Sequence, residues 1–469
     1  MSFKEFQQRR QLEAAASSPV PAPAPPPAPT APAPTEPMDD APTESSGAAA
    51  PTTWRVKGKR GVLVREAVSL DSALVGELPH GALVELFDEA SAVVSARLRI
   101  VAPVDGWVTA RLLEPVARQQ PVGPSTGPPP APPPDAYAWV ANLEVPAAYE
   151  GPALGGGAVD GAFIDAALIH LRSQKLLDRR SVLLILAKTR QLLAAESTVV
   201  DLAIPAAAPH YTVCGDVHGQ FYDLLNIFEM NGLPSAANPY VFNGDMVDRG
   251  SFSFEVAISL FMLKARDSSA VHLNRGNHET RTMAKFYGFE GEILHKYDRA
   301  VLDLFHECFC LLPLGCVIER RVIVVHGGCP STDDVTLDDI RAIDRDDEPP
   351  EIGVFCDLLW SDPQPLDGRT PSRRGVGLSF GPDVTRAFLA KNDLGLLIRS
   401  HEVRENGYEV EHGGALITIF SAPNYCDAVG NKGALIHLGR DLAPKFTTFE
   451  AVPHPPVRPM AYSAFAQFT

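Results

Sequence analysis

Five short apolar runs in this sequence are each followed directly by residues that can bind metal ions. The segments at their ends are "GDVHGQ", "GDMVDRG", "RGNHE", "VHGG" and "RSHEV". Three oxygen donors and three imidazoles stand in them: Asp216, His218, Asp245, Asn277, His326 and His401. Oxygen and imidazole donors without thiolates favour hard to borderline divalent ions such as manganese, iron, zinc or magnesium. This set suffices for two ions if one carboxylate bridges them.

Each of these residues alone has an ordinary explanation. An Asp at a strand end is often a turn or helix cap, and a His is often a hydrogen-bonded polar group. Their recurrence at five strand ends, next to glycines that let the backbone approach closely, favours a shared site instead. In α/β proteins ligands bind beyond the carboxyl ends of the strands, so these side chains are expected to meet.

The elements that must position these residues can be predicted from the pattern around them. The runs "HYTVCGD", "PYVFNGDMVDRG", "AVHLNRGNHE" and "RVIVVHGG" predict β-branched or aromatic strands that stop at polar turns. Residues 163–196 carry apolar side chains at helical spacing and predict two amphipathic helices, with Asp178 as the cap of the second. Strands that alternate with helices indicate an α/β fold.

The same segments, together with "LLWSDP" and "FSAPNYCD", resemble the phosphoprotein phosphatases, the metal-dependent serine/threonine protein phosphatases. The first three segments also occur in other metallophosphoesterases, whereas "LLWSDP", "RSHEV" and "SAPNYCD" narrow the resemblance to protein phosphatases. The likeness extends from about Tyr149 to Met460 and is greatest to members with tetratricopeptide repeats before the catalytic domain. No such repeat is recognised here. The resemblance implies a metallophosphoesterase fold, in which two mixed β-sheets form a central sandwich flanked by helices.

The resemblance also assigns the ligands. It implies one ion on Asp216, His218 and a bridging Asp245. It implies a second ion on Asp245, Asn277, His326 and His401. The expected cofactor is two divalent ions, either manganese or an iron/zinc or iron/manganese pair. Such a pair lowers the pKa of a shared water and neutralises phosphate oxygens, which suits the slow hydrolysis of a phosphate monoester.

His278 matches the proton donor of the family and would protonate the departing seryl or threonyl oxygen. Asp248 would pair with this imidazole and favour its cationic form. The alternative role for Asp248 is the N-cap of the helix that begins near "SFSFEV", although Ser251 could fill that role.

Three further residues are expected to bind the phosphate. Arg249 and Arg374 would hold its oxygens with their planar guanidinium groups, and Arg374 is preferred over its neighbour Arg373 by the spacing to "GV". Tyr425 in "SAPNYCD" would contact the phosphate or the bridging water through its hydroxyl. Its alternative role is that of a packed aromatic side chain.

Asn274 in "VHLNRGNHET" stands where members of the family usually have an apolar leucine. A polar amide near a strand end must find hydrogen-bond partners or water. We expect the support of the site to differ there.

Composition limits the partners of the chain. The net charge of -16 argues against a general nucleic-acid binder, because phosphate backbones are held by clustered Lys and Arg. No apolar run approaches the length of a membrane span, so no membrane partner is expected. Seven cysteines without a C-x-x-C pair are typical of reduced thiols and indicate a cytoplasmic or nuclear protein. The Ala- and Pro-rich N-terminal region is also compatible with targeting to an organelle.

Pro-rich stretches divide the chain. Residues 1–52 predict a disordered Pro/Ala-rich arm, and residues 117–148 a Pro-rich linker. Between them, residues 53–116 predict several short strands and weakly resemble the small SH3-like (SH3b) barrels, with a possible protein partner. Residues 149–469 form the predicted catalytic domain. Its last residues, "VRPMAYSAFAQFT", suit a frayed terminus better than a segment folded over the site.

The expected function is hydrolysis of phosphoserine and phosphothreonine in phosphorylated protein substrates, with the small β module in targeting or regulation. Two other classes stay open. One is a catalytically silent scaffold that only binds phosphoproteins, which the complete ligand set disfavours. The other is an enzyme for nucleotides or other small phosphoesters, because a metal centre does not select the group attached to the phosphoryl oxygen.

Overall fold

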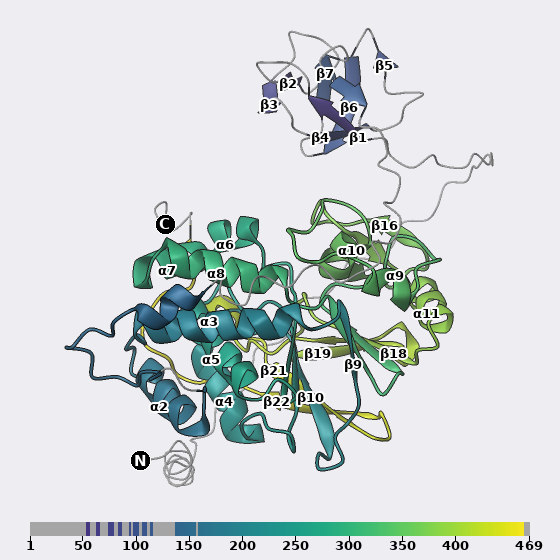
Figure 1. Cartoon of the computed structure of the whole chain (residues 1–469). Helices are drawn as coiled ribbons and strands as arrows, with labels where there is room; N and C mark the ends of the chain where they lie inside the picture. The colour runs from purple at the N-terminus through teal and green to yellow at the C-terminus, as the bar shows by residue number, and fades with distance from the viewer. Residues whose placement is uncertain are drawn as a thin grey trace, which may run out of the picture. The chain divides into compact units, whose positions relative to one another are not determined.

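The computed structural model describes eight strands between residues 53 and 115, and then residues 137–155 and 158–463 (Figure 1). These parts belong to two compact units, one with the eight strands and one with the remainder. The predicted arm, most of the predicted linker and the end of the chain lie outside the described residues.

The first unit is a single antiparallel sheet, as expected from the short alternating runs. Its strands pair in the order β3-β2-β7-β6-β4-β1-β8, with β5 on β6. Their bounds are β1 Thr53–Val56, β2 Val62–Arg65, β3 Leu74–Leu78, β4 Leu83–Leu86, β5 Val93–Val94, β6 Arg97–Ala102, β7 Gly106–Thr109 and β8 Leu113–Pro115. The described pairings are open at β3 and β8, so they do not confirm the expected SH3-like barrel.

The second unit contains two mixed sheets, which confirms the predicted metallophosphoesterase arrangement. The five-stranded sheet has the order β12-β11-β10-β21-β22, and the six-stranded sheet β19-β20-β18-β14-β13-β9. The strands of the first sheet are β10 His210–Cys214, β11 Tyr240–Asn243, β12 Val271–Asn274, β21 Gly433–Gly439 and β22 Pro444–Phe449. Those of the second are β9 Val199–Leu202, β13 Gly315–Ile318, β14 Val322–Val325, β18 Leu396–Arg399, β19 Tyr408–Glu411 and β20 Leu416–Ile419.

Helices cover the sheets on their outer faces. The five-stranded sheet is covered by η2 Ala138–Asn142, α2 Gly161–Arg172, α3 Arg179–Ala194, α4 Phe221–Asn231, α5 Ser253–Arg266, α6 Arg281–Tyr287, α7 Phe289–Lys296 and α8 Arg299–Cys310 (Figure 1). Beside the other sheet lie α9 Leu337–Arg341, α10 Val354–Trp360, α11 Pro382–Lys391 and a small sheet of β15 Asp362–Pro363, β16 Arg369–Pro371 and β17 Leu378–Phe380.

The two predicted helices are confirmed as α2 and α3. The Asp178 carboxylate accepts a hydrogen bond from the Ser181 N–H at 2.9 Å and so caps α3. The compact unit begins before the predicted boundary at residue 149, because Val140 of η2 is fully buried against these helices.

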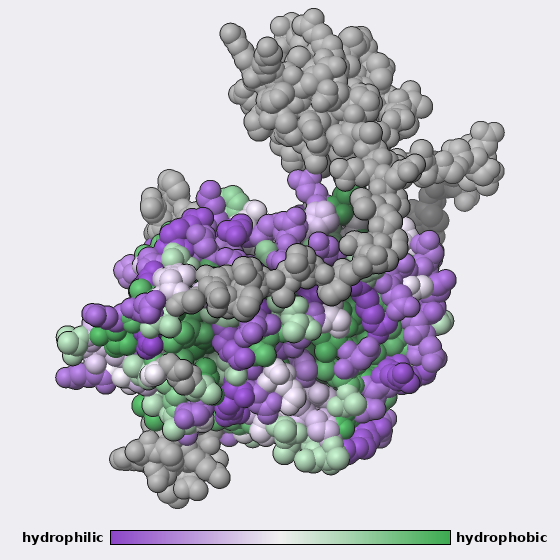
Figure 2. Space-filling model, in the orientation of Figure 1, coloured by the Kyte–Doolittle hydropathy of each residue, from purple (hydrophilic) through white to green (hydrophobic). Residues whose placement is uncertain are grey.

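An apolar layer between the two sheets holds them together. Alternate residues of each strand point into it, for example Val213 and Val241 from one sheet and Val324 and Ile398 from the other. On the visible outer face of this unit hydrophilic residues predominate, with smaller hydrophobic areas between them (Figure 2). Among the described residues, no helix is long and apolar enough to cross a membrane.

The end of the described chain packs against the loop after β11. The Met460 N–H donates to the Arg249 carbonyl at 2.8 Å, and the Ser251 hydroxyl donates to the Arg458 carbonyl at 2.6 Å. The expectation of a frayed terminus is therefore wrong as far as Ser463. Its last six residues lie outside the described part.

Candidate metal and phosphate site

The predicted ligands all lie just beyond the carboxyl ends of strands and come together at one edge of the sandwich. Strands β10, β11 and β12 of the five-stranded sheet precede Asp216, His218, Asp245, Asp248, Arg249, Asn277 and His278. Strands β14 and β18 of the other sheet precede His326 and His401. Both sheets therefore contribute to the site, as the repeated pattern of strand and polar turn predicts.

The turns that carry these residues have an unusual backbone. His218, Asp245, Asp248, Arg249 and His401 all have positive φ, between 40° and 70°. Non-glycine residues rarely adopt this region, and such strain concentrates at functional sites. At the neighbouring Gly276 a Cβ atom would lie 2.2 Å from the carboxylate of Asp245, so only glycine allows this approach.

The carboxylate of Asp245 faces a different group of imidazoles with each of its oxygens. Its Oδ2 lies 3.4 Å from His218 Nε2, and its Oδ1 lies 3.3 Å from His326 Nε2. His218 Nε2 is also 3.6 Å from Asp216 Oδ2. Asp245 thus belongs to two groups of possible metal ligands, one with His218 and His278 and one with His326 and His401. This is the placement expected of a bridging carboxylate.

Hydrogen bonds fix which ring nitrogens face the site. The His218 Nδ1 hydrogen-bonds to the Val247 carbonyl at 2.9 Å, and the His326 Nδ1 to the Asn243 carbonyl at 2.8 Å. Their Nε2 atoms therefore point at Asp245. The His326 Nε2 also lies 3.0 Å from Asn277 Oδ1 and 3.2 Å from His401 Nδ1, so donor atoms of all three converge on one point.

The electrostatics of these buried groups suit a cation. Burial, and then the neighbouring Asp245, raises the pKa of Asp216 to about 8. Although burial lowers the pKa of His326, the carboxylates of Asp245 and Asp216 raise it to about 9. The two carboxylates thus require positive charge, which either a proton or a metal ion can supply. The donor set of carboxylate, amide and imidazole fits divalent metal ions.

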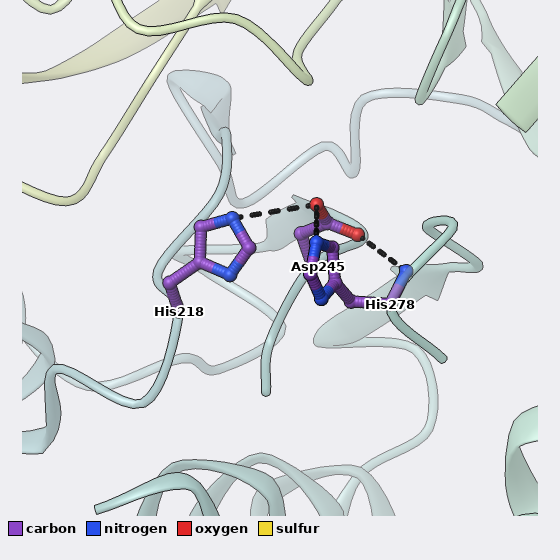
Figure 3. A group of neighbouring side chains, drawn as sticks. All are labelled: His218, Asp245 and His278. Carbon is purple, nitrogen blue, oxygen red and sulfur yellow. Dashed lines mark hydrogen bonds and ion pairs between the residues drawn. The ribbon is translucent and has the colours of Figure 1, made fainter. Parts of the chain in front are cut away.

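His278 belongs to the same group of possible ligands as His218 and Asp245, and the three residues lie close together (Figure 3). Its Nδ1 hydrogen-bonds to Asp248 Oδ2 at 2.8 Å, and its Nε2 lies 4.0 Å from Asp245 Oδ2. Asp248 Oδ1 accepts from the Phe289 N–H at 2.9 Å, so one oxygen holds the imidazole and the other holds the start of α7. Asp248 is not the cap of α5, because the carboxylate of Glu292 accepts from the first N–H groups of that helix.

The expected cationic preference of His278 is opposed by its surroundings. Burial lowers the pKa of His278 to about 4, although the Asp245 carboxylate acts to raise it. Burial also raises the pKa of Asp248 well above its usual range. The hydrogen bond between them fixes the orientation of the imidazole, while the charge on the pair depends on what else enters the site.

The three predicted phosphate contacts line the same cavity of 320 Å³ as Asp216, His218, Asp245, His278 and His401. The Arg249 guanidinium lies 3.8 Å over the ring of Tyr287. Arg374 Nε donates to Asp362 Oδ2 at 2.6 Å, whereas Arg373 does not line the cavity. The ring of Tyr425 lies 5.1 Å from that of His218.

Sequence reasoning missed the residues that hold this arrangement in place. Glu279 is fully buried and accepts from the N–H groups of Asp245, Met246 and Gly276, each at 2.8 Å. Its only sequence signal is its place directly after "RGNH". Asp362, at the start of β15, holds Arg374, and only its position in "WSDP" pointed to it.

Comparison with known proteins agrees with this geometry. A sequence profile described as Calcineurin-like phosphoesterase matches residues 209–405, which include every predicted ligand. The tomato (Solanum lycopersicum) protein named Serine/threonine-protein phosphatase 5 is 58% identical over 323 residues, which are 69% of this chain and 58% of that protein. The Trypanosoma brucei brucei protein named Serine/threonine-protein phosphatase T is 52% identical, over 68% of each chain.

A solved structure of a Saccharomyces cerevisiae serine/threonine phosphatase, described as similar to human phosphatase PP5, is 44% identical. It superimposes with a TM-score of 0.60 and is matched over 95% of its length and 62% of this chain. The chain therefore belongs to the serine/threonine-protein phosphatases of the calcineurin-like phosphoesterase class. It spans less than two thirds of the length of the tomato protein.

A second profile, described as the PPP5 TPR repeat region, matches residues 135–201. The match includes η2, α2 and α3 and begins within the predicted linker. The expectation that nothing here resembles a tetratricopeptide region is corrected by this match. The strands at 53–115 lie ahead of it.

Proposed function

We propose that this chain is a serine/threonine protein phosphatase that hydrolyses phosphoserine and phosphothreonine monoesters with two divalent metal ions. The observation that carries the proposal is the division of the Asp245 carboxylate between two groups of ligands, next to His278 and the two arginines. When bound, the ions supply a water of lowered pKa and neutralise the phosphate oxygens. Manganese, or an iron/zinc or iron/manganese pair, fits the donors.

The remaining steps fall to the side chains of the chain itself. The guanidinium groups of Arg249 and Arg374 orient the phosphate. The hydrogen bond from Arg374 to Asp362 keeps the Arg374 guanidinium in place. The Tyr425 hydroxyl stays protonated and can donate, since burial raises its pKa well above the usual range. His278 Nε2 faces the cavity and delivers the proton to the leaving oxygen, while Asp248 accepts from the other nitrogen.

A groove beside the site supports proteins as substrates. It has a volume of 820 Å³ and shares His278, Arg249 and Arg374 with the metal cavity. Its lining also includes Met283, Tyr287, Pro349, Pro350 and Trp360. Such a surface suits the residues that flank a phosphorylated side chain more than a small phosphoester does.

The test is hydrolysis by the purified chain with added manganese, compared on a phosphothreonine peptide and a dinucleotide polyphosphate. We expect turnover of the peptide and a much slower reaction with the dinucleotide. No turnover of either substrate with metal demonstrably bound would leave a phosphoprotein-binding scaffold. Faster turnover of the dinucleotide would indicate a small-phosphoester enzyme.

We further propose that the strands at 53–115 form a targeting or regulatory module with a protein partner. The separation of these strands into their own compact unit supports this. Removal of residues 1–116 should leave the rate on an aryl phosphate unchanged and lower the rate on a physiological phosphoprotein. Equal loss on both substrates would contradict a targeting role.

We also propose a cytoplasmic or nuclear location for the protein. All seven cysteines are free, and six of them are buried. Free thiols persist in a reducing compartment. Imaging of the tagged full chain tests this, and an organellar signal would contradict it.

A further inference from the structure

Two asparagine side chains lie in the largely apolar layer between the two sheets. Asn243 ends β11 and Asn274 ends β12, and the two residues are directly paired in register. Both are buried, with 0% and 1% of their surface exposed. Their neighbours in this layer, such as Val241 and Val324, are apolar. Buried amides are retained only with hydrogen-bond partners, so the identity of these partners indicates their role.

The Asn274 amide connects the two sheets. Its Nδ2 donates to Asn243 Oδ1 at 2.8 Å within the five-stranded sheet. The same group donates to the Val324 carbonyl at 3.1 Å, on β14 of the six-stranded sheet. A hydrogen bond, which depends on direction, therefore crosses a layer in which most contacts are apolar and do not depend on direction.

The Asn243 amide continues the connection to the ends of two strands in the second sheet. Its Nδ2 donates to the Val325 carbonyl at 2.8 Å and to the Ser400 hydroxyl at 2.9 Å. Val325 and Ser400 directly precede the ligands His326 and His401 in the sequence. The Asn243 carbonyl also accepts the hydrogen bond from His326 Nδ1.

Apart from Cys316 on β13, which is also hydrogen-bonded to Asn274, every end of this network lies one to three residues before a predicted metal ligand. Asn243 precedes Asp245 by two residues, and Asn274 precedes Asn277 by three. The ligands Asp245 and Asn277 belong to one sheet, whereas His326 and His401 belong to the other. Metal binding requires their spacing to be correct within a few tenths of an ångström, which apolar packing alone does not enforce.

We propose that Asn274 is a positioning residue that holds the two sheets in the register required by the metal position shared by Asp245, Asn277, His326 and His401. The proposal deepens the proposed function and rests on it, because these four residues are taken as ligands. It predicts that loss of the amide affects this metal position more than the one at Asp216 and His218, whose ligands all come from strands of a single sheet.

The test replaces the amide with an apolar side chain of similar size, Asn274→Leu, in the full chain. We expect the affinity for manganese at the position of Asp245, Asn277, His326 and His401 to fall about 10- to 100-fold, as for other groups that orient metal ligands. Titration of manganese into the metal-free protein measures this directly, and the electron paramagnetic resonance spectrum of the manganese pair reports on its geometry. Peptide hydrolysis should be impaired at limiting manganese and recover as manganese is raised.

His272→Leu is the matched control. His272 lies on the same strand two residues earlier, is buried, and has its ring 6.0 Å from that of Tyr211 in the same layer. The His272→Leu variant also exchanges a polar for an apolar side chain, but His272 is not part of the hydrogen bonds made by Asn243 and Asn274. We expect its manganese titration and spectrum to match those of the parent chain.

Ser400→Ala is the second variant if Asn274→Leu does not fold. It removes the acceptor at the end of β18 and should weaken manganese binding in the same selective way, to a smaller extent. A loss of thermal stability in the metal-free protein with unchanged manganese titration would overturn the proposal, since the amide would then be structural only. Equal weakening of both metal positions would overturn it as well. Failure of the proposed function itself would instead appear as absent hydrolysis in the parent chain with manganese bound.

Discussion

The two sides of Asp245 are built in different ways. On one side Asp216, His218 and His278 all lie at the ends of neighbouring strands of the five-stranded sheet, so backbone hydrogen bonds between those strands already set their spacing. On the other side His326 and His401 come from the second sheet and meet Asp245 across the sandwich. The difference shows that one half of the site depends on strand pairing, and the other half on how two sheets pack.

Asp245 is the residue on which both sides depend, and its removal should have the largest effect. Asp245→Ala should abolish stable binding of both ions and lower the rate about 10³-fold or more, because charge stabilisation of the phosphate depends on both. The metal content after dialysis measures the loss of the ions, and the rate of peptide hydrolysis measures the loss of activity. Asp357→Ala is the control, since Asp357 is also buried but bonds to Ser331. Retention of both ions in Asp245→Ala would refute the bridge.

Arg374 tests the phosphate-binding wall rather than the metal positions. Arg374→Ala should lower kcat/KM roughly 10- to 100-fold with metal content unchanged, because a charge-assisted hydrogen bond contributes about 1.5–3 kcal/mol. Arg373→Ala is the matched neighbour and should be close to the parent, since Arg373 does not line the cavity. Equal losses of kcat/KM in the two variants would mean that the general positive charge of this segment binds the phosphate. The Arg374 guanidinium held by Asp362 would then have no special role.

His272 provides a pH test of the layer between the sheets. Burial, and then Lys264, lowers the pKa of His272 to about 3, and its Nδ1 has no hydrogen-bond partner in the described structure. Between about pH 6.5 and 3, His272 is therefore protonated in the unfolded chain but neutral in the folded chain. The contribution of His272 to the free energy of unfolding is complete above about pH 6.5 and falls as the pH decreases toward 3. Between about pH 7.5 and 5.5, His272→Leu should remove roughly 1.4 kcal/mol of this loss.

Chemical denaturation of the parent chain and of His272→Leu at both pH values measures that difference. A parallel loss of stability in the two proteins would show that His272 is not held neutral.

The smallest effect is expected where the end of the chain packs beside Arg249. Ser251→Ala removes the hydroxyl that donates to Arg458 and accepts from the Ala461 N–H, and should cost about 1 kcal/mol of stability. Limited proteolysis should cut sooner near the C-terminus, with metal content unchanged. Unchanged proteolysis and unchanged melting temperature would show that this packing contributes little.

Local patterns in the sequence were sufficient for much of the site. Each strand and the polar turn after it can be recognised within about ten residues, so Asp216, Asp245, Asn277, His326 and His401 could be placed at strand ends before the sheets were known. Periodicity also identified α2 and α3. These features depend on contacts close in sequence.

The features that the sequence did not indicate depend on contacts between distant residues. The partners of Asn274 and the packing of Met460 on Arg249 each join segments far apart in the chain, and the bond between Arg374 and Asp362 spans 12 residues. The effect of burial on His278 also required the surrounding elements to be in place. A single sequence carries no periodic signal for such contacts.

The central claim is that Asp245 holds metal on both sides while His278, which lies within the same group as His218 and Asp245, holds a proton. His278→Ala tests it most directly when metal content and rate are measured on the same preparation. We predict that manganese content stays at the parent level and that the rate on a phosphothreonine peptide falls roughly 10²- to 10⁴-fold. The loss should be smaller on an aryl phosphate, whose leaving group needs less protonation. Loss of manganese in parallel with Asp245→Ala, or equal loss of rate on both substrates, would contradict this account.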